Sequence, residues 1–239
     1  MAAYLCHEAP DLLTFEAEVL DSRPGAVVLS RSAFYPGGGG QPPDQGEIAW
    51  NGGAVAVAGI EQQGGKLWHL LAEPAELSGQ VEARIDPDFR FLMQQLHTGL
   101  HLINALAFQE FDGALVTGAN MTGEGVARID LDLPGADNQR LRAMEPALND
   151  VIAQDLAVTT FAMPLAEAAQ EPGTLRSKAV TPPAQPDGSV RIVEIAGLDR
   201  QACGGTHLGS TGESRPLRIL KVENKGRHNR RIKIGLGDL

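Results

Sequence analysis

Hydrophobic and polar residues alternate over short stretches in the first third of the chain. These stretches are rich in β-formers and are separated by Gly, Pro, Asn and Asp, at the spacing expected of a small barrel or sandwich. No helical pattern of useful length interrupts them. The pattern predicts an N-terminal, small β-barrel-like domain over residues 1–85. Its strands are expected at Leu12–Leu20, Ala26–Arg31, Glu47–Trp50, Ala54–Glu61, Lys66–Leu71 and Gln80–Ile85.

A long helix is predicted to follow this β region. Asp86 is a suitable N-cap and Pro87 suits the first helical position, so the helix should begin here and run to about Glu110. Apolar residues cover most of its surface, which is typical of a helix buried in a core. The main apolar stripe consists of Leu92, Leu96, Leu100, Ile103 and Ala107.

Strands and helices both occur in the rest of the chain, so the whole is predicted to be an α+β protein with a second domain over residues 86–239. Asp137 should cap a second helix, which Pro146 is expected to kink. Strands are expected at Gly113–Met121, Val126–Leu133, Leu156–Met163 and Val190–Ile195, a short helix at Pro164–Glu171 and a Pro-rich loop at Ser177–Gly188.

Composition limits the class of protein. Hydrophobic residues make up 43% of the 239 residues, which is enough for a sizeable core. No run of 18 or more apolar residues occurs, so no membrane association is expected. The N-terminus lacks the basic start and apolar stretch of a signal peptide, and two cysteines imply no disulfide framework. A cytoplasmic location is therefore expected, and no obligate protein partner is inferred.

The charge is distributed unevenly. The net charge of −10 argues against a nucleic-acid-binding protein, but residues 214–233 hold eight basic residues against one acid, Glu223. The rest of the chain then carries −17. A local basic patch on an acidic protein can still contact a phosphate backbone. The alternative is a solvated strand-and-turn region that happens to be basic.

Four consecutive glycines, Gly37, Gly38, Gly39 and Gly40, lie between predicted strands. Without side chains they let another backbone or a ligand approach closely. The stretch matches neither the phosphate-loop pattern nor the dinucleotide-binding pattern. By local chemistry alone, a flexible hairpin turn is the simpler interpretation.

Two pairs of metal-ligand residues indicate a zinc site. His97 and His101 are four residues apart in the predicted helix, which puts both imidazoles on one face. Cys203 and His207 flank a turn whose two glycines let both side chains point the same way. Thiolate and neutral imidazole are good zinc ligands, and a set of three nitrogens and one sulfur favours zinc among the common metals.

Other roles for these residues are possible. Taken alone, His97 and His101 would be interpreted as two satisfied core histidines. Cys203 could be a nucleophile activated by His207, although no Cys-protease signature surrounds it. Thr98 stands where the zinc peptidase motif His-Glu-x-x-His has its general base, so a peptidase is disfavoured.

A helical His-x3-His followed about a hundred residues later by Cys-Gly-Gly-Thr-His resembles the editing domain of alanyl-tRNA synthetases. It is similar to the freestanding alanyl-tRNA editing proteins called AlaX, and to the editing domain of threonyl-tRNA synthetases. The resemblance spans nearly the whole chain and, with no synthetase domain before it and no long extension after it, fits the medium-length AlaX type. Further matching residues are Phe34–Pro42, Arg90, Arg128–Asp130, Thr211–Glu213, Lys225–Gly226 and Arg230–Ile232.

The resemblance implies an α/β-sandwich editing domain that hydrolyses mischarged tRNA(Ala), chiefly seryl-tRNA(Ala) and possibly the glycyl form. It implies one zinc ion held by His97, His101 and Cys203, with His207 as fourth ligand or supporting partner. Thr117 aligns with the family's serine-recognising threonine; otherwise it is an ordinary strand threonine. The glycine loop becomes a candidate for approach to the aminoacylated terminus, and the candidate tRNA contacts are Arg218, Lys225, Arg230 and Arg231.

Two functions of other classes stay open. A non-catalytic, zinc-stabilised tRNA-binding module would have a closed four-ligand site and would bind tRNA without deacylating it. A metal-dependent hydrolase of a small ester would not need the basic segment.

Overall fold

The structure, a computed structural model, describes residues 5–178, 185 and 187–238. Contacts between Cα atoms divide the chain into two units. The first unit is Met1–Gly38 with Pro42–Phe91, and the second is Gly39–Gln41 with Leu92–Leu239. The division into domains at residue 86 stays a prediction.

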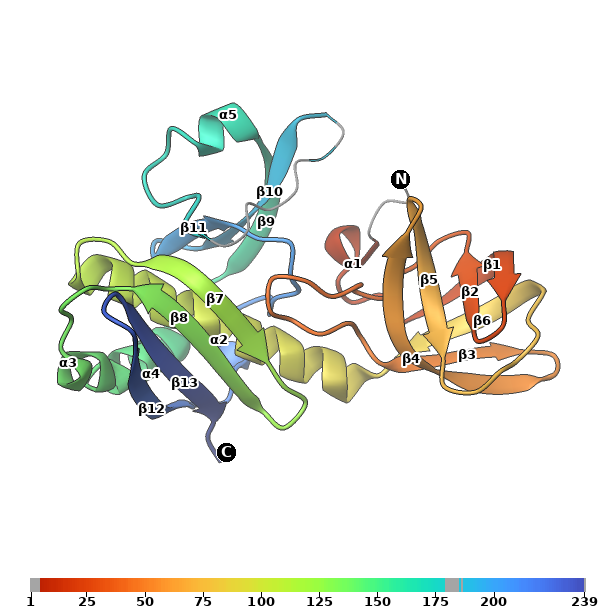
Figure 1. The fold of residues 1–239 in the computed structure, drawn as a ribbon, viewed down its shortest axis with the longest axis horizontal. Coiled ribbons are helices and arrows are strands. Elements are labelled where there is room, and N and C mark those ends of the chain that lie inside the picture. The colour runs from red at the N-terminus through yellow and green to blue at the C-terminus, as the bar shows by residue number, and fades with distance from the viewer. Residues whose placement is uncertain (1–4, 179–184, 186, 239) are drawn as a thin grey trace. The chain divides into compact units, whose positions relative to one another are not determined.

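The first unit contains a closed barrel of six antiparallel strands in the order β1-β2-β5-β4-β3-β6 (Figure 1). All six predicted strands are present, and a short helix, α1 (Leu5–Glu8), is an addition that the sequence did not predict. The strands are β1 (Thr14–Arg23), β2 (Ala26–Leu29), β3 (Gly46–Trp50), β4 (Gly53–Gln63), β5 (Lys66–Leu71) and β6 (Gly79–Ile85).

Alternation along the strands fills the barrel. In β4, Val55 and Val57 are buried while their neighbours are exposed, and β6 buries Val81, Ala83 and Ile85 in the same way. Because successive side chains of a strand point to opposite faces, a period of two puts one set inside. Phe15, Val27, Phe34 and Ile48 belong to the same core.

A buried ion pair fixes the base of the glycine loop within this unit. Arg90 and Asp44 are almost completely buried and form a salt bridge, and Arg90 also donates to the carbonyl of Ala33 at 2.8 Å. The Asp44 oxygen that pairs with Arg90, Oδ2, also accepts the Tyr35 amide at 2.5 Å. Since a buried charge is tolerated only when it is paired and hydrogen-bonded, this network holds the chain on both sides of the loop.

The second unit is built around the part of α2 (Pro87–Glu110) that begins at Leu92, and residues 93 to 105 of this helix are all buried. Asp86 caps the helix by accepting from the amides of Asp88 and Phe89, each at 3.0 Å, as predicted. A Cβ at Gly99 would lie 3.0 Å from Leu217 and 3.2 Å from Ile234, so a small residue lets the helix lie close on a sheet. None of the helices in the described residues is long and apolar enough to cross a membrane.

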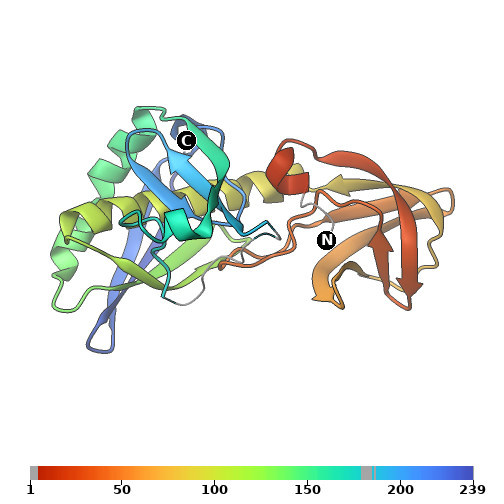
Figure 2. The same cartoon turned by 90° about the horizontal axis from the view of Figure 1, so that it is seen from above.

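Two antiparallel sheets accompany α2, one of four strands in the order β12-β13-β8-β7 and one of three in the order β11-β10-β9 (Figure 2). The four-stranded sheet comprises β7 (Leu115–Met121), β8 (Val126–Asp132), β12 (Leu217–Lys225) and β13 (Asn229–Leu236). The three-stranded sheet comprises β9 (Val158–Pro164), β10 (Ser189–Ile195) and β11 (Asp199–Ala202). Together with the barrel, these sheets and α2 make a mixed α+β protein.

The predicted second helix is in fact two helices, α3 (Asn138–Arg142) and α4 (Glu145–Ala153). Asp137 caps α3 as expected. Pro146 lies in the first turn of α4, where its missing N–H costs nothing, so it begins a new helix instead of kinking one. The helix α5 (Leu165–Ala168) is shorter than predicted, and most of the predicted loop Ser177–Gly188 lies outside the described residues.

Candidate metal centre

The two predicted ligand pairs come together in the second unit. Their four donor atoms, one each from His97, His101, Cys203 and His207, all lie within 4.8 Å of one another. The His207 ring centroid is 4.5 Å from each of the other two imidazole centroids, and Cys203 Sγ is 3.4 Å from His97 Nε2. Three nitrogens and one sulfur in such a cluster match the donor set that binds a metal such as zinc.

Each half of the cluster has a separate origin. The helical spacing of four residues puts the rings of His97 and His101 on one face of α2, with centroids 5.4 Å apart. The other half lies in the turn that follows β11. Arg191 on β10 holds this turn, because its guanidinium donates to the carbonyls of Cys203 at 2.9 Å and Gly205 at 3.0 Å.

Burial keeps the imidazoles of His97 and His101 neutral. It lowers the pKa of His97 to about 3, with a smaller contribution from the positive charge of Arg191. Burial likewise lowers the pKa of His101 well below its usual value, helped by His97 and by two nearby arginines. Neutral imidazole is the form that binds metals. His101 Nδ1 has no hydrogen-bond partner among the described residues, and a metal ion would satisfy such a buried atom.

The Cys203 thiol behaves differently from the imidazoles. Burial raises its pKa, against smaller opposing effects from the Gly205 amide, which donates to the sulfur, and from Arg191. At neutral pH the sulfur therefore keeps its proton in the absence of a cation. Because the ligand form is the thiolate, binding of a metal here would release a proton.

Gln41 is a residue of this site that the sequence analysis did not single out. Its amide oxygen contacts His97 Nδ1 at 2.8 Å and accepts the Thr206 amide at 3.1 Å, while its amide nitrogen donates to Thr206 Oγ1 at 2.8 Å. A carbonyl oxygen can only accept, so Nδ1 of His97 carries the hydrogen and Nε2 is left with its lone pair toward the cluster. Such outer partners orient metal-binding histidines.

Thr98 supports the other side of the cluster. Its hydroxyl lies 3.3 Å from His207 Nδ1 and accepts the Leu208 amide at 3.2 Å. Thr98, at the position of the glutamate in the zinc peptidase motif, thus connects the end of the Cys203–His207 turn to α2. Its side chain is completely buried.

The last glycine of the loop, Gly40, is required by close packing against a strand. A Cβ at Gly40 would overlap the backbone of Ala119 on β7, and the Gly40 carbonyl accepts the Met121 amide at 2.8 Å. All four glycines have positive φ, a conformation that residues with side chains rarely adopt. The close approach at Gly40 is therefore made to a strand, and it places the following residue, Gln41, beside His97.

The remaining predicted site residues differ in their surroundings. Thr117 lies at an irregularity of β7, half-buried, and its hydroxyl donates to the Asp130 carbonyl at 3.2 Å. Of the basic candidates, Arg218 and Lys225 are exposed. Arg230 is buried and donates to the Ala136 carbonyl, and Arg231 makes two 2.7 Å bonds to Asp130.

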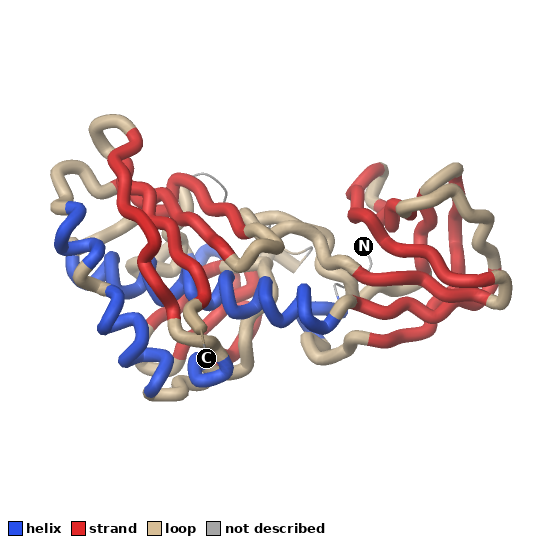
Figure 3. The backbone as a smooth tube through the Cα atoms, turned by 90° about the horizontal axis from the view of Figure 1, so that it is seen from below, coloured by secondary structure: helices blue, strands red, loops and turns tan. Residues whose placement is uncertain are grey.

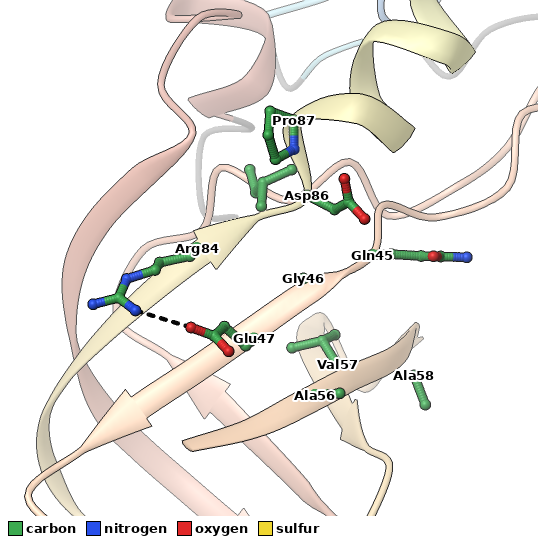
Figure 4. A pocket seen from close by; sticks show the side chains of 10 residues that line it. Gln45, Gly46, Glu47, Ala56, Val57, Ala58, Arg84, Asp86 and Pro87 are labelled. Atoms are coloured by element: carbon green, nitrogen blue, oxygen red, sulfur yellow. Dashed lines mark hydrogen bonds and ion pairs between the residues drawn. The ribbon is translucent and has the colours of Figure 1, made fainter. Parts of the chain in front are cut away.

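A separate hollow of about 570 Å³ lies in the barrel unit between β3, β4 and β6 (Figure 4). Arg84 and Glu47 form an ion pair across its rim at 2.9 Å. Its lining contains no histidine and no cysteine. It therefore lacks the donor set of the metal cluster.

Comparison with known proteins agrees with this geometry. The model of the threonyl and alanyl tRNA synthetase second additional domain matches residues 190–233, and that of class II (A) tRNA synthetases matches residues 7–89. The alanyl-tRNA editing protein AlaX-M of Saccharolobus solfataricus is 34% identical over 91% of this chain and 92% of its own length. This chain belongs to the AlaX-M family.

Other relatives fit the same assignment. The AlaX-M protein of Methanosarcina mazei is 33% identical over 95% of this chain and 93% of its own length. The alanine–tRNA ligase of Korarchaeum cryptofilum is 36% identical over 91% of this chain, but the match covers only 24% of that enzyme. The chain thus spans nearly the whole of the AlaX-M relatives and about a quarter of the ligase.

Proposed function

We propose that this member of the AlaX-M family hydrolyses the ester bond of mischarged tRNA(Ala), chiefly seryl-tRNA(Ala), using one zinc ion. The observation that carries the proposal is the buried cluster of His97, His101, Cys203 and His207 in a chain that matches alanyl-tRNA editing proteins along their length. Serine exceeds alanine by one hydroxyl, which a synthetase pocket rejects poorly, so a second hydrolytic step is needed. The cytoplasmic location stays a prediction.

The protein's own residues would prepare the site for this chemistry. Gln41 sets the hydrogen on His97, Thr98 supports the turn that carries His207, and Arg191 holds the Cys203 and Gly205 carbonyls. The buried surface of α2 excludes water from one side. Zinc in this site would polarise the ester carbonyl or lower the pKa of a bound water.

The coordination number separates this proposal from its alternative. A catalytic zinc ion keeps one open position, whereas four protein ligands close the tetrahedron. In an editing enzyme, His207 would therefore act as a displaceable ligand or a supporting group. The compactness of all four donors also suits a second candidate, a zinc-stabilised module that binds tRNA without hydrolysing it.

A deacylation assay distinguishes the two functions. Purified protein would be mixed with seryl-, glycyl- and alanyl-tRNA(Ala), with and without a zinc chelator. We expect release of serine to be fast, release of alanine to stay near the uncatalysed rate, and the chelator to abolish the activity until zinc is restored. Protein that binds tRNA(Ala) tightly but releases no amino acid under any metal condition would instead be the binding module.

Thr117 is proposed as the residue that recognises the seryl hydroxyl. Because its own hydrogen is donated to the Asp130 carbonyl, its oxygen can accept a hydrogen bond from serine but not from alanine. Replacing Thr117 with valine keeps the shape and removes the acceptor. We expect the ratio of serine to alanine release to fall by about 10-fold, in line with the loss of one hydrogen bond of roughly 1.5 kcal/mol. An unchanged ratio would show that another residue reads the hydroxyl.

The tRNA contacts belong to the same proposal. Arg218 and Lys225 are exposed on β12 and could meet phosphates directly. The internal bonds of Arg230 and Arg231 suit a role in shaping the sheet on which such contacts lie. The glycine loop, Gly37–Gly40, is proposed to lie near the aminoacylated terminus, because it leads directly into Gln41 beside the metal cluster.

A further inference from the structure

Three basic residues lie side by side across the four-stranded sheet. Lys221 on β12 is directly opposite Lys233 on β13, and Lys233 is directly opposite Arg128 on β8. Adjacent strands of a sheet are about 4.8 Å apart, so the row spans roughly 10 Å. Asn120 on β7 is opposite Arg128 and extends the row to a fourth strand. We call this set of four residues the cationic row.

The cationic row lies on the face of the sheet that points away from α2. The alternate residues Val222, Ile232 and Ile129 are buried, and Leu217 and Ile234 of the same sheet lie close to Gly99 of α2. Because neighbouring residues of a strand point to opposite faces, the row belongs to the other face. Figure 3 shows the strands of this sheet alongside the central helix.

Nearby carboxylates offset only part of this charge. Lys221 pairs with Glu223 at 2.9 Å, and Asp130 is shared between Arg128 at 2.8 Å and Arg231 at 2.7 Å. Among the described residues, no carboxylate oxygen lies within ion-pair distance of the Lys233 ammonium, although the charge of Lys233 contributes to lowering the pKa of Glu223. The three cations of the row and Arg231 therefore share two acids. This part of the sheet stays positive on a chain with a net charge of −10.

By itself, the cationic row lowers the stability of the folded protein. Like charges directly opposite each other on antiparallel strands are destabilising. Several exposed cations elsewhere in this chain lie next to acids, as in the pairs Arg23–Glu61, Lys66–Asp21, Arg140–Glu110 and Arg200–Glu194. In the cationic row, Lys221 and Arg128 each have an acidic partner, but Lys233 between them has none in the described part of the chain. A polyanion lying across the row would reduce the repulsion that remains.

We propose that the cationic row binds the sugar–phosphate backbone of the tRNA whose ester the metal centre would hydrolyse. This inference rests on the proposed function and adds a surface to it. Lys221 and Lys233 supply point charges, and Arg128 supplies a planar group that pairs with phosphate oxygens in a bidentate way. The Asn120 amide can donate to a phosphate or a ribose hydroxyl.

The test compares a double variant, Lys221→Gln with Lys233→Gln, with the wild-type protein in binding uncharged tRNA(Ala) over a range of salt concentrations. The control, Arg200→Gln, removes one exposed, acid-paired cation from the three-stranded sheet. We expect the double variant to bind about 10-fold more weakly or worse. The slope of the logarithm of the binding constant against the logarithm of the salt concentration should be smaller in magnitude by about two. Its unfolding midpoint should not fall, because the substitutions relieve repulsion.

Two further measurements secure the interpretation. The variant Lys221→Arg with Lys233→Arg keeps the charges and should bind tRNA like the wild type. That result would show that the glutamine variant binds weakly because it has lost charge, and not because these two positions must be lysine. In seryl-tRNA(Ala) hydrolysis, the glutamine variant should raise KM and leave kcat nearly unchanged.

Each outcome bears on one proposal or the other. Affinity and salt dependence equal to those of the Arg200→Gln control would overturn the role of the cationic row, even if the wild type releases serine. Wild-type protein that binds tRNA through these lysines but releases no amino acid would contradict the hydrolase function and leave the surface in place.

Discussion

Substitution of His101 by alanine is expected to remove the metal from the protein and to abolish release of serine from mischarged tRNA(Ala). The imidazole is buried, and its Nδ1 has no hydrogen-bond partner among the described residues. Loss of one donor from a cluster of four leaves a site that holds zinc poorly. Since a metal acting as a Lewis acid contributes several kcal/mol, kcat/KM should fall by about a thousandfold or more.

Two measurements on the same sample check this expectation. Bound zinc would be measured by elemental analysis, and circular dichroism would show that the variant is folded. His228→Ala provides a matched control, because His228 is an exposed histidine between β12 and β13 and its loss should leave the zinc content unchanged. Full activity of the His101→Ala protein with no metal bound would rule out a zinc-dependent mechanism.

A second large effect is expected at Gly205, with its neighbour Gly204 as the control. A Cβ at Gly205 would overlap the ring of His97, whereas a Cβ at Gly204 would meet nothing within 4 Å. Neither glycine has a positive φ, so steric overlap is the difference between them. Gly205→Ala should push His97 out of place and lower kcat/KM by about 100-fold, the effect of a misplacement of roughly 1 Å.

Gly204→Ala should keep both zinc and activity within about twofold, since it adds one methyl group in open space. Denaturant unfolding would be measured for both variants, and overpacking should destabilise Gly205→Ala alone, by about 1–3 kcal/mol. Equal zinc content and equal activity in the two variants would mean that the contact between Gly205 and His97 does not set the geometry of the site.

Local patterns in the sequence predicted the elements whose cause is local. Rough alternation, β-forming residues and the turn residues between them predicted the six barrel strands, and Asp86 with Pro87 predicted the start of α2. The four candidate metal ligands were found because each pair has a short spacing that puts two side chains together. Pro146 was predicted to kink one helix, which was wrong. It lies in the first turn of α4, where a proline suits the start of a helix.

Residues whose role depends on distant partners were not predictable in this way. Gln41 acts on His97 and Thr206, which are 56 and 165 positions away. The orientation of Arg231 depends on which residue of β8 lies opposite, and the register puts Asp130 there. A basic residue in a sequence looks the same whether its side chain meets solvent or an internal carboxylate.

The placement of Gly39–Gln41 limits where the chain can be divided. These three residues come from a loop in the N-terminal part of the chain, yet their contacts belong to the second unit, where Gln41 fixes the hydrogen on His97. A gene fragment that begins at α2 would encode all four candidate metal ligands but not the Gln41 amide that orients one of them. Such a fragment is therefore expected to hold His97 less firmly than the full chain does.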